Sequence, residues 1–277
     1  MTEKTITCCV HECTTNLDKN YWDNQYKNRA TGWDLGEVSP ALKHIIDNIK
    51  DLSKRILIPG CGNAYEAMYL IRKGFRNITL IDISPTLVFE LKAKFASFKE
   101  IEVIEGDFFQ LDSKFDIILE QTFFCALPPF KRQHYVYKMH DLLCENGSLI
   151  GVLFNRQFEK SPPFGGSQDE YEQLFKNAFN FLHLDICTDS AIPRAGSELF
   201  ISFSKNNLSV KLYNMSGLSC NSCAIKVQEE LSTIKSIENI SISTNFKQML
   251  IVSKNEIPIN ILQNVLAYNN NLTIQNA

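Results

Sequence analysis

Two short motifs in this chain of 277 residues carry side chains that could bind a ligand. The first is Gly60-Cys61-Gly62, which follows an aliphatic run and precedes a helix-like stretch. Glycines at such a turn let the backbone bend sharply and lie against a ligand. Asp82 comes 22 residues after Gly60, where a carboxylate can accept hydrogen bonds from both hydroxyls of a ribose. This spacing indicates a nucleotide-type ligand.

Gly106-Asp107-Phe108-Phe109 follows the next expected strand and could hold an adenine between a carboxylate and a ring. Tyr65 occupies the place of the third glycine of the dinucleotide fingerprint, which argues against a dinucleotide. Each motif taken alone has a structural alternative: the glycines only make a turn, and Asp82 only caps the following helix. Together, at the ends of successive strands, they favour a ligand site at one edge of an open sheet.

The second motif, Cys220-Asn-Ser-Cys223, places two thiols at the start of another helix-like stretch. Thiolates with this spacing converge on one soft ion, and the helix N-terminus favours their anionic form. Two sulfurs suit Cu(I) or a similar thiophilic ion better than zinc, which would need two more ligands. A redox dithiol and a structural pair are the alternatives. The cluster Cys8-Cys9-Val-His11-Glu-Cys13 stays unassigned, with metal binding a minority hypothesis.

The elements that must position these residues alternate between β-branched runs and amphipathic stretches, which predicts an α/β fold with a parallel sheet covered by helices. Strands are expected at 55–59, 77–82, 101–105, 115–120, 148–155, 181–188 and 198–205. Helices are expected at 40–52, 63–73, 85–98 and 129–144, the last stopped by Asn146-Gly147.

A polar break near Lys205-Asn206-Asn207 precedes a second unit. Its expected order, with strands or helices at 210–213, 223–234, 237–243, 248–252, 258–267 and 272–275, is βαββαβ, a small α+β ferredoxin-like arrangement. We therefore expect a flexible tail over 1–16, a first domain over 17–205 and a second over 208–277.

Composition narrows the class of protein. The chain is 44% hydrophobic with a formal net charge of −3, which gives no electrostatic footprint for nucleic acid or an anionic membrane. No apolar run approaches the roughly 20 residues that span a bilayer, and no secretory signal is visible. Nine scattered cysteines are an odd count for a disulfide framework, so reduced thiols are expected. A cytoplasmic enzyme or small-ligand binder, with no nucleic-acid or membrane partner, is favoured.

The motifs of the first domain resemble the thiopurine S-methyltransferase superfamily, nearer to its plant thiol/halide methyltransferase branch. In family order they are Tyr21-Trp22-Asp23-Asn24-Gln25-Tyr26, Thr31-Gly32-Trp33-Asp34-Leu35-Gly36, Pro59-Gly60-Cys61-Gly62 with Glu66, Asp82-Ile83-Ser84, Gly106-Asp107-Phe108-Phe109, Phe123-Phe124-Cys125-Ala126 and Ile192-Pro193-Arg194-Ala195-Gly196. The resemblance covers 17–205. It implies a Rossmann-like class I methyltransferase that uses S-adenosyl-L-methionine.

The resemblance also implies roles for the residues that match. Asp82 would hold the ribose, the turn at Gly60 and Gly62 would face the methionine part, and Asp107 with Phe108 would flank the adenine. Further cofactor contacts are implied for the N-terminal aromatics and for one strand end: Trp22, Tyr26, Trp33 and Gln121. Tyr26 stands where the plant branch has a tryptophan, and Gln121 where it commonly has a tyrosine. These two differences concern the preference for the methyl acceptor more than the cofactor. A ring face near the sulfonium cation contributes about 0.5–2 kcal/mol.

Methyl transfer is expected as an in-line displacement in which orientation supplies most of the effect. A thiolate or halide is already nucleophilic, so the absence of an evident His/acid pair fits a small soft acceptor: a thiol, a halide or a metalloid anion. Cys125 is interpreted as a small buried hydrophobe. Six apolar side chains would wall the acceptor pocket or equally belong to the core: Phe123, Phe124, Phe130, Pro162, Pro163 and Phe164.

The second domain resembles the heavy-metal-associated domain of copper chaperones and metal-transporting ATPases. The resemblance implies that Cys220 and Cys223 bind a soft metal ion, while Leu218 replaces the methionine common at that position. The sequence thus predicts a methyltransferase fused to a metal-binding module. The alternative is a metal-binding or sensing protein whose first domain binds the cofactor without turnover.

Overall fold

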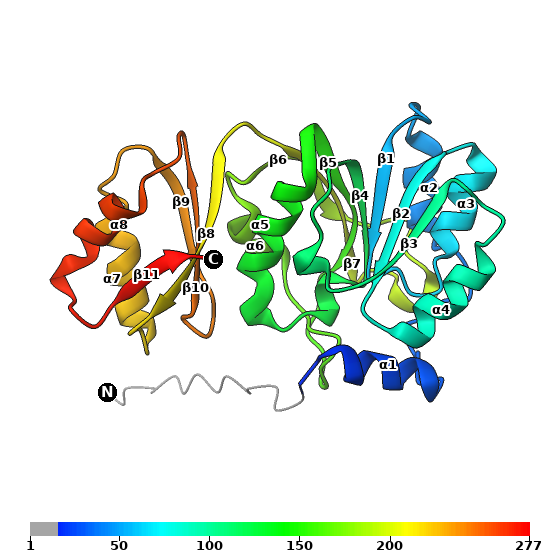
Figure 1. The fold of residues 1–277 in the computed structure, drawn as a ribbon, viewed down its shortest axis with the longest axis horizontal. Helices are drawn as coiled ribbons and strands as arrows, with labels where there is room; N and C mark the ends of the chain where they lie inside the picture. The colour runs from blue at the N-terminus through cyan, green and yellow to red at the C-terminus, as the bar shows by residue number, and fades with distance from the viewer. Residues whose placement is uncertain (1–15) are drawn as a thin grey trace.

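The computed structural model describes residues 16–277, which form two sheets and their covering helices (Figure 1). The expected tail over 1–16, apart from Asn16, lies outside the described residues, as does the cluster that begins at Cys8. Within the described residues, no helix has the length and apolar character needed to cross a membrane.

The larger sheet has seven strands in the order β3-β2-β1-β4-β5-β7-β6. Their bounds are β1 Arg55–Pro59, β2 Asn77–Asp82, β3 Ile101–Glu105, β4 Phe115–Gln121, β5 Leu143–Phe154, β6 Phe179–Ile186 and β7 Glu198–Lys205. The helices that pack in one core cluster on one face are α2 Pro40–Asn48, α3 Tyr65–Lys73 and α4 Pro85–Lys94. The helices on the other face are α5 Arg132–Leu142 and α6 Gln168–Phe175.

The sheet is mixed, so the prediction of a parallel sheet is wrong at one edge. The strands from β3 to β5 are parallel to their neighbours, whereas β7 runs antiparallel to both β5 and β6. The chain passes from β6 to β7 through residues 187–197, which contain only the 3₁₀ turn Ile192–Arg194. A parallel return would need a longer crossover, usually a helix.

Four strand predictions, those for β1, β2, β3 and β7, agree with the structure to the residue. The helix predicted over 129–144 differs: it starts as the 3₁₀ turn Pro129–Lys131, continues as α5 and ends at Leu142. Asn146, with φ +60°, lies inside β5 and does not end a helix. The sequence also gave no prediction for α1 Lys19–Lys27 or α6, because both are short and polar.

The C-terminal unit is a four-stranded antiparallel sheet in the order β11-β8-β10-β9, with two helices on one face. Its elements are β8 Ser209–Ser216, α7 Asn221–Leu231, β9 Ile237–Ile242, β10 Gln248–Ser253, α8 Ile259–Val265, the 3₁₀ turn Leu266–Tyr268 and β11 Thr273–Asn276. The element order is therefore βαββαβ, as the sequence predicted.

Both faces of this small sheet are covered. Met249 and Ile251 of β10 pack under α7 and α8, whereas the alternate residues Leu250 and Val252 belong to the same core cluster as Tyr135 of α5. Figure 1 shows the resulting layers from left to right: α7 and α8, the small sheet, α5 and α6, the large sheet, then α2 and α3. The two units share one continuous apolar core at α5.

Candidate active site

A cavity of about 1070 Å³ opens at the carboxyl ends of the central strands. It lies beside the point where the strand order reverses between β1 and β4, the place where open α/β sheets bind ligands. The structure brings all nine sequence-predicted cofactor residues to its lining: Trp22, Tyr26, Trp33, Gly60, Gly62, Asp82, Asp107, Phe108 and Gln121.

The turn after β1 is built for close approach. Gly60 and Gly62 have φ of +55° and +51°, in the left-handed region that side chains rarely adopt. A Cβ at position 60 would lie 2.3 Å from Cδ2 of Phe123. The backbone N–H of Cys61 donates to the carbonyl of Ile81 at 3.3 Å, which ties the turn to β2. The turn therefore presents bare backbone to the cavity.

Asp82, at the end of β2, is a buried carboxylate on the cavity wall. Its Oδ2 accepts the N–H of Gly62 at 3.4 Å and its Oδ1 accepts the N–H of Ser84 at 3.0 Å. Burial raises the pKa of Asp82 to about 6, against the lowering effect of these donors. The cap of α4 is Ser84, whose Oγ accepts the N–H of Leu87 at 3.2 Å. Asp82 thus links the glycine turn to the start of α4 without capping the helix itself.

The helix α1 carries two of the predicted aromatics and is docked through a buried carboxylate. Asp23 accepts hydrogen bonds from the hydroxyl of Ser84 and the N–H of Thr86, both at 2.8 Å. Burial acts to raise the pKa of Asp23, but hydrogen bonds from Lys27, Thr86 and Ser84 outweigh it and hold the pKa well below its usual range. Asp23 therefore fixes α1 on the N-terminus of α4, at the rim of the cavity.

Three aromatic rings gather at that rim. Trp33 meets the ring of Trp22 at 5.7 Å between centroids and that of Tyr26 at 5.9 Å, both edge to face. The backbone carbonyl of Trp33 accepts a hydrogen bond from Nη2 of Arg194 at 2.7 Å. Arg194 is itself buried near Glu198, with 3.5 Å between Nη1 and Oε1. These contacts join the N-terminal aromatics to the start of β7.

Asp107 and Phe108 occupy the cavity edge beyond β3. Oδ1 of Asp107 accepts the N–H of Phe109 at 2.9 Å and so caps the 3₁₀ turn Phe108–Gln110. The rings of Phe108 and Phe123 pack edge to face, with 5.0 Å between their centroids. At the end of β4, Oε1 of Gln121 accepts the hydroxyl of Ser39 at 2.6 Å, which ties that strand to the cap of α2.

The other end of the cavity is mainly apolar. Phe123, Phe130, Pro162 and Pro163 line it as expected. The other two of the six, Phe124 and Phe164, do not line it and are buried, which is the core alternative that the sequence left open. The Phe124 ring is 1% exposed and packs edge to face against core tyrosines, because the 3₁₀ turn after β4 points it inward.

Cys125 also lines this end, but burial raises the pKa of its thiol far above the usual value. A thiol that stays protonated is a poor nucleophile, so Cys125 acts here as a small apolar residue. Among the described residues that line the cavity there is no histidine.

Sequence reasoning missed several residues of the lining: Asp34, Glu66, Lys131, Phe154, Arg156, Phe158 and Arg194. Burial raises the pKa of Glu66 to about 7. Arg156 reaches the cavity because the loop after β5 folds back, with the N–H of Gly166 donating to its carbonyl at 3.1 Å. No local pattern signals such a loop closure. Asp34, Glu66 and Arg194 stand in the family motifs given above, which was the available signal for them.

The family model described as thiopurine S-methyltransferase matches residues 17–198. The chain belongs to the thiopurine S-methyltransferase family. As a member of this family it is an S-adenosylmethionine-dependent methyltransferase.

Individual relatives agree with this assignment. A probable thiol methyltransferase 2 from Arabidopsis thaliana is 32% identical over 171 residues, 59% of this chain and 75% of that protein. Thiocyanate methyltransferase 1 from Brassica oleracea is 25% identical over 189 residues, 66% of this chain and 83% of that one. A Burkholderia thailandensis 1,6-didemethyltoxoflavin-N1-methyltransferase, solved with S-adenosylhomocysteine, shares the fold: TM-score 0.55, 17% identity, covering 68% of this chain and 87% of that one.

The match to this methyltransferase family ends before β8, so the thiol pair of the C-terminal unit lies outside it. Cys220 is the N-cap residue of α7, and its Sγ lies 2.9 Å from that of Cys223. Hydrogen bonds from Cys223 and Ser222 lower the pKa of Cys220 to about 7. All six cysteines of the described chain are free thiols. Over residues 16–277 no group of three or more His, Cys, Asp or Glu side chains is placed to hold a metal ion.

Proposed function

We propose that this family member transfers the methyl group of S-adenosyl-L-methionine to a small soft nucleophile: a thiol, a halide or a metalloid anion. One observation carries the proposal. A single cavity joins a bare glycine turn and a buried carboxylate to an end walled by phenylalanine and proline, and no histidine of the described chain lines it. Such a site can orient a nucleophile that needs no general base.

The residues of this cavity suit the cofactor. Asp82 would accept the ribose hydroxyls, since its carboxylate is buried and faces the cavity. The turn at Gly60 and Gly62 lines the cavity with backbone atoms that would contact the methionine part, while the Phe123 ring fills the position that a Cβ of residue 60 would take. Asp107 and Phe108 would flank the adenine. The cofactor supplies a methyl group on a positively charged sulfur.

The aromatic rim would recognise that charge. The rings of Trp22, Tyr26 and Trp33 form one edge-to-face cluster at the cavity. A ring face close to the cation contributes about 0.5–2 kcal/mol, more where water is excluded. The same cluster would shield the reacting atoms from water, since α1 is fixed in place by Asp23.

Two arguments support the proposed class of acceptor: the reactivity of soft nucleophiles and the names of the relatives. A thiolate or halide attacks without a base, and the relatives are named for thiol and thiocyanate methylation. The test is turnover of labelled cofactor with a panel of an alkyl thiol, an aryl thiol, iodide, thiocyanate and selenite. Methylation of at least one member is expected. Cofactor binding without transfer to any of them would instead favour a binding protein without turnover.

We propose a second function, soft-metal binding, for the C-terminal unit. In this proposal residues 17–205 form the methyltransferase domain, and residues 208–277 form a ferredoxin-like heavy-metal-associated domain. The supporting observation is the pair Cys220 and Cys223, with sulfurs 2.9 Å apart at a helix N-terminus. Two thiolates without further ligands suit Cu(I). The six free thiols of the described chain support a reducing, cytoplasmic setting.

A further inference from the structure

The helix α5 is buried on almost every side. Eight of its 11 residues are buried, polar Gln133 and His140 among them. A helix on a protein surface would keep one polar face in water. Here one side of α5 packs on the large sheet, and the C-terminal sheet covers another, as Figure 1 shows.

The contact between α5 and the C-terminal sheet is specific. Val210, Leu212, Leu250 and Val252, from β8 and β10, belong to the core cluster of the methyltransferase domain. Gln133, only 7% exposed, donates from Nε2 to Oγ of Ser241 at 2.9 Å and to the carbonyl of Ile242 at 3.3 Å.

A second polar contact joins the two units elsewhere. Nδ2 of Asn239, in β9, donates to the carbonyl of Lys176 at 3.0 Å. The polar and apolar contacts together hold the C-terminal unit in one place on the methyltransferase domain.

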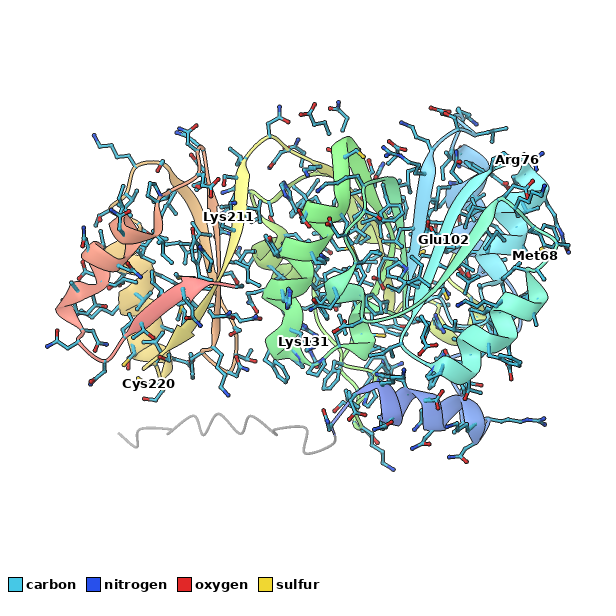
Figure 2. The ribbon with its side chains drawn as sticks, viewed as in Figure 1. Met68, Arg76, Glu102, Lys131, Lys211 and Cys220 are labelled. Carbon is cyan, nitrogen blue, oxygen red and sulfur yellow. The ribbon has the colours of Figure 1, made fainter. Side chains whose placement is uncertain are left out.

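The segment 128–131 connects this contact to the cavity. Pro128, Phe130 and Lys131 line the cavity, and Gln133 follows two residues later, in the first turn of α5. Nζ of Lys131 lies 4.7 Å from the centre of the Phe109 ring, at the cavity wall. Figure 2 shows Lys131 at the lower end of α5, the end of that helix nearest α1.

The methyltransferase domain holds the same turn from its own side. Arg132 pairs with Glu170, and its Nη2 donates to the carbonyl of Gly165 at 2.7 Å. The first turn of α5 is thus held by the 165–170 segment through Arg132 and by β9 through Gln133.

A second connection runs through Tyr135. Its hydroxyl donates to Oε2 of Glu120 at 2.6 Å, and Oε1 of Glu120 accepts the N–H groups of Phe123 at 2.9 Å and Phe124 at 3.0 Å. Phe123 is the ring that lies against Gly60. The position of α5 therefore sets two parts of the cavity wall, the 128–131 segment and the Phe123 loop.

We propose that the C-terminal unit positions the acceptor end of the cavity through α5, and that Gln133 is the positioning residue that joins them. The inference rests on the proposed acceptor site. It makes the C-terminal unit part of the methyl-transfer apparatus as well as a metal-binding module.

The test compares variants of the full chain. Gln133→Ala removes the side chain, and Gln133→Met removes the hydrogen bonds while keeping most of the volume. Both are expected to raise the acceptor KM about three- to tenfold, the size of effect that follows from losing a buried hydrogen-bonding group, with the Kd for S-adenosylhomocysteine within about twofold of wild type. Asn239→Ala, the matched control, removes a polar contact between the same two units away from 128–131 and is expected to leave both constants unchanged.

Ser241→Ala is expected to give a smaller rise in acceptor KM, and to add nothing when combined with Gln133→Ala, because both remove the same contact. If Gln133→Ala does not fold, Gln133→Met and Ser241→Ala carry the comparison. The proposal is overturned if the Gln133 variants lower only the thermal midpoint, or if Asn239→Ala raises KM as much. Wild-type protein that methylates no acceptor would show instead that the proposed function itself is wrong.

Discussion

The ring of Phe123 lies directly against Gly60: a Cβ added at Gly60 would be 2.3 Å from Cδ2 of Phe123. Gly60 also has φ +55°, so Gly60→Ala would meet both a clash and an unfavourable backbone conformation. We expect this variant to weaken S-adenosylhomocysteine binding at least about tenfold, measured by calorimetry, because the turn or the Phe123 ring, both in the cavity wall, must shift. Gly196→Ala is the control, since Gly196 also has a positive φ of +73° but does not line the cavity, and a methyl there would meet no atom within 4 Å. Wild-type affinity in Gly60→Ala would contradict the role of the turn.

The carboxylate of Asp82 should make cofactor binding depend on pH. Its pKa is raised to about 6, and the ionised form is the better acceptor for two ribose hydroxyls. Protonation below that pKa therefore weakens binding, so the Kd for S-adenosylhomocysteine should rise by up to about tenfold per pH unit below pH 6 and level off above pH 7.

Asp82→Asn separates this effect from that of Glu66, another carboxylate of the cavity, whose pKa is raised to about 7. The variant should bind weakly and lose the part of the pH profile that belongs to Asp82. Calorimetric titrations at pH 5, 6, 7 and 8 compare the two proteins. An unchanged slope in Asp82→Asn would show that another group governs binding.

The aromatic rim should distinguish the cofactor from its product, because only the cofactor carries a cationic sulfur. Trp33→Leu is expected to weaken binding of S-adenosylmethionine about 2- to 30-fold, and binding of S-adenosylhomocysteine less. Trp33→Phe keeps a ring and should recover part of the difference. Equal losses for both ligands in Trp33→Leu would mean that Trp33 only packs against Trp22 and Tyr26.

Much of this site could be predicted from sequence because it follows local rules. Gly60 and Asp82 each stand directly at the end of a strand, and the order of parallel strands then brings them together. Arg194 and Arg156 could not be placed this way. Arg194 reaches Trp33 across 161 positions of sequence, and Arg156 faces the cavity only because its loop folds back on Gly166. The packing of β10 on α5 could not be predicted either, because a strand with two buried faces shows only a continuous apolar run in the sequence.

The thiol pair predicts a specific metal affinity. Cys220→Ser with Cys223→Ser should abolish stoichiometric Cu(I) binding in a competition assay with a chromogenic Cu(I) chelator, because both sulfurs, 2.9 Å apart, act as ligands. Cys144→Ser, which removes a single partly exposed thiol near Arg55, should bind Cu(I) like wild type. Retention of one equivalent of Cu(I) by the double variant, in protein whose Cys8, Cys9 and Cys13 are also changed to Ser, would refute the ligand assignment. Reversible formation of a disulfide between the two thiols, without metal binding, would favour the redox alternative.

Stability should fall in mild acid because of His140, on the buried side of α5. Its Nε2 has no hydrogen-bond partner within the described chain, and burial, with Lys205 nearby, lowers its pKa to about 4. The unfolded chain binds this proton near pH 6.5, so between pH 6.5 and 4 the unfolded state holds more protons than the folded one. The free energy of unfolding therefore decreases as pH falls through that window, by up to about 3 kcal/mol for this group.

His140→Gln removes this titration and should flatten the pH dependence, measured as urea midpoints at pH 7, 6, 5 and 4. Part of the slope should remain, because burial also lowers the pKa of His134 to about 4, and the double variant with His134→Gln should be flatter still. His44→Gln, which changes an exposed histidine beside Asp189, provides the control and should keep the wild-type slope. If His140→Gln kept that slope too, the protonation that weakens the folded state would have to occur elsewhere, and the contact between α5 and its surroundings would not be acid-sensitive through this side chain.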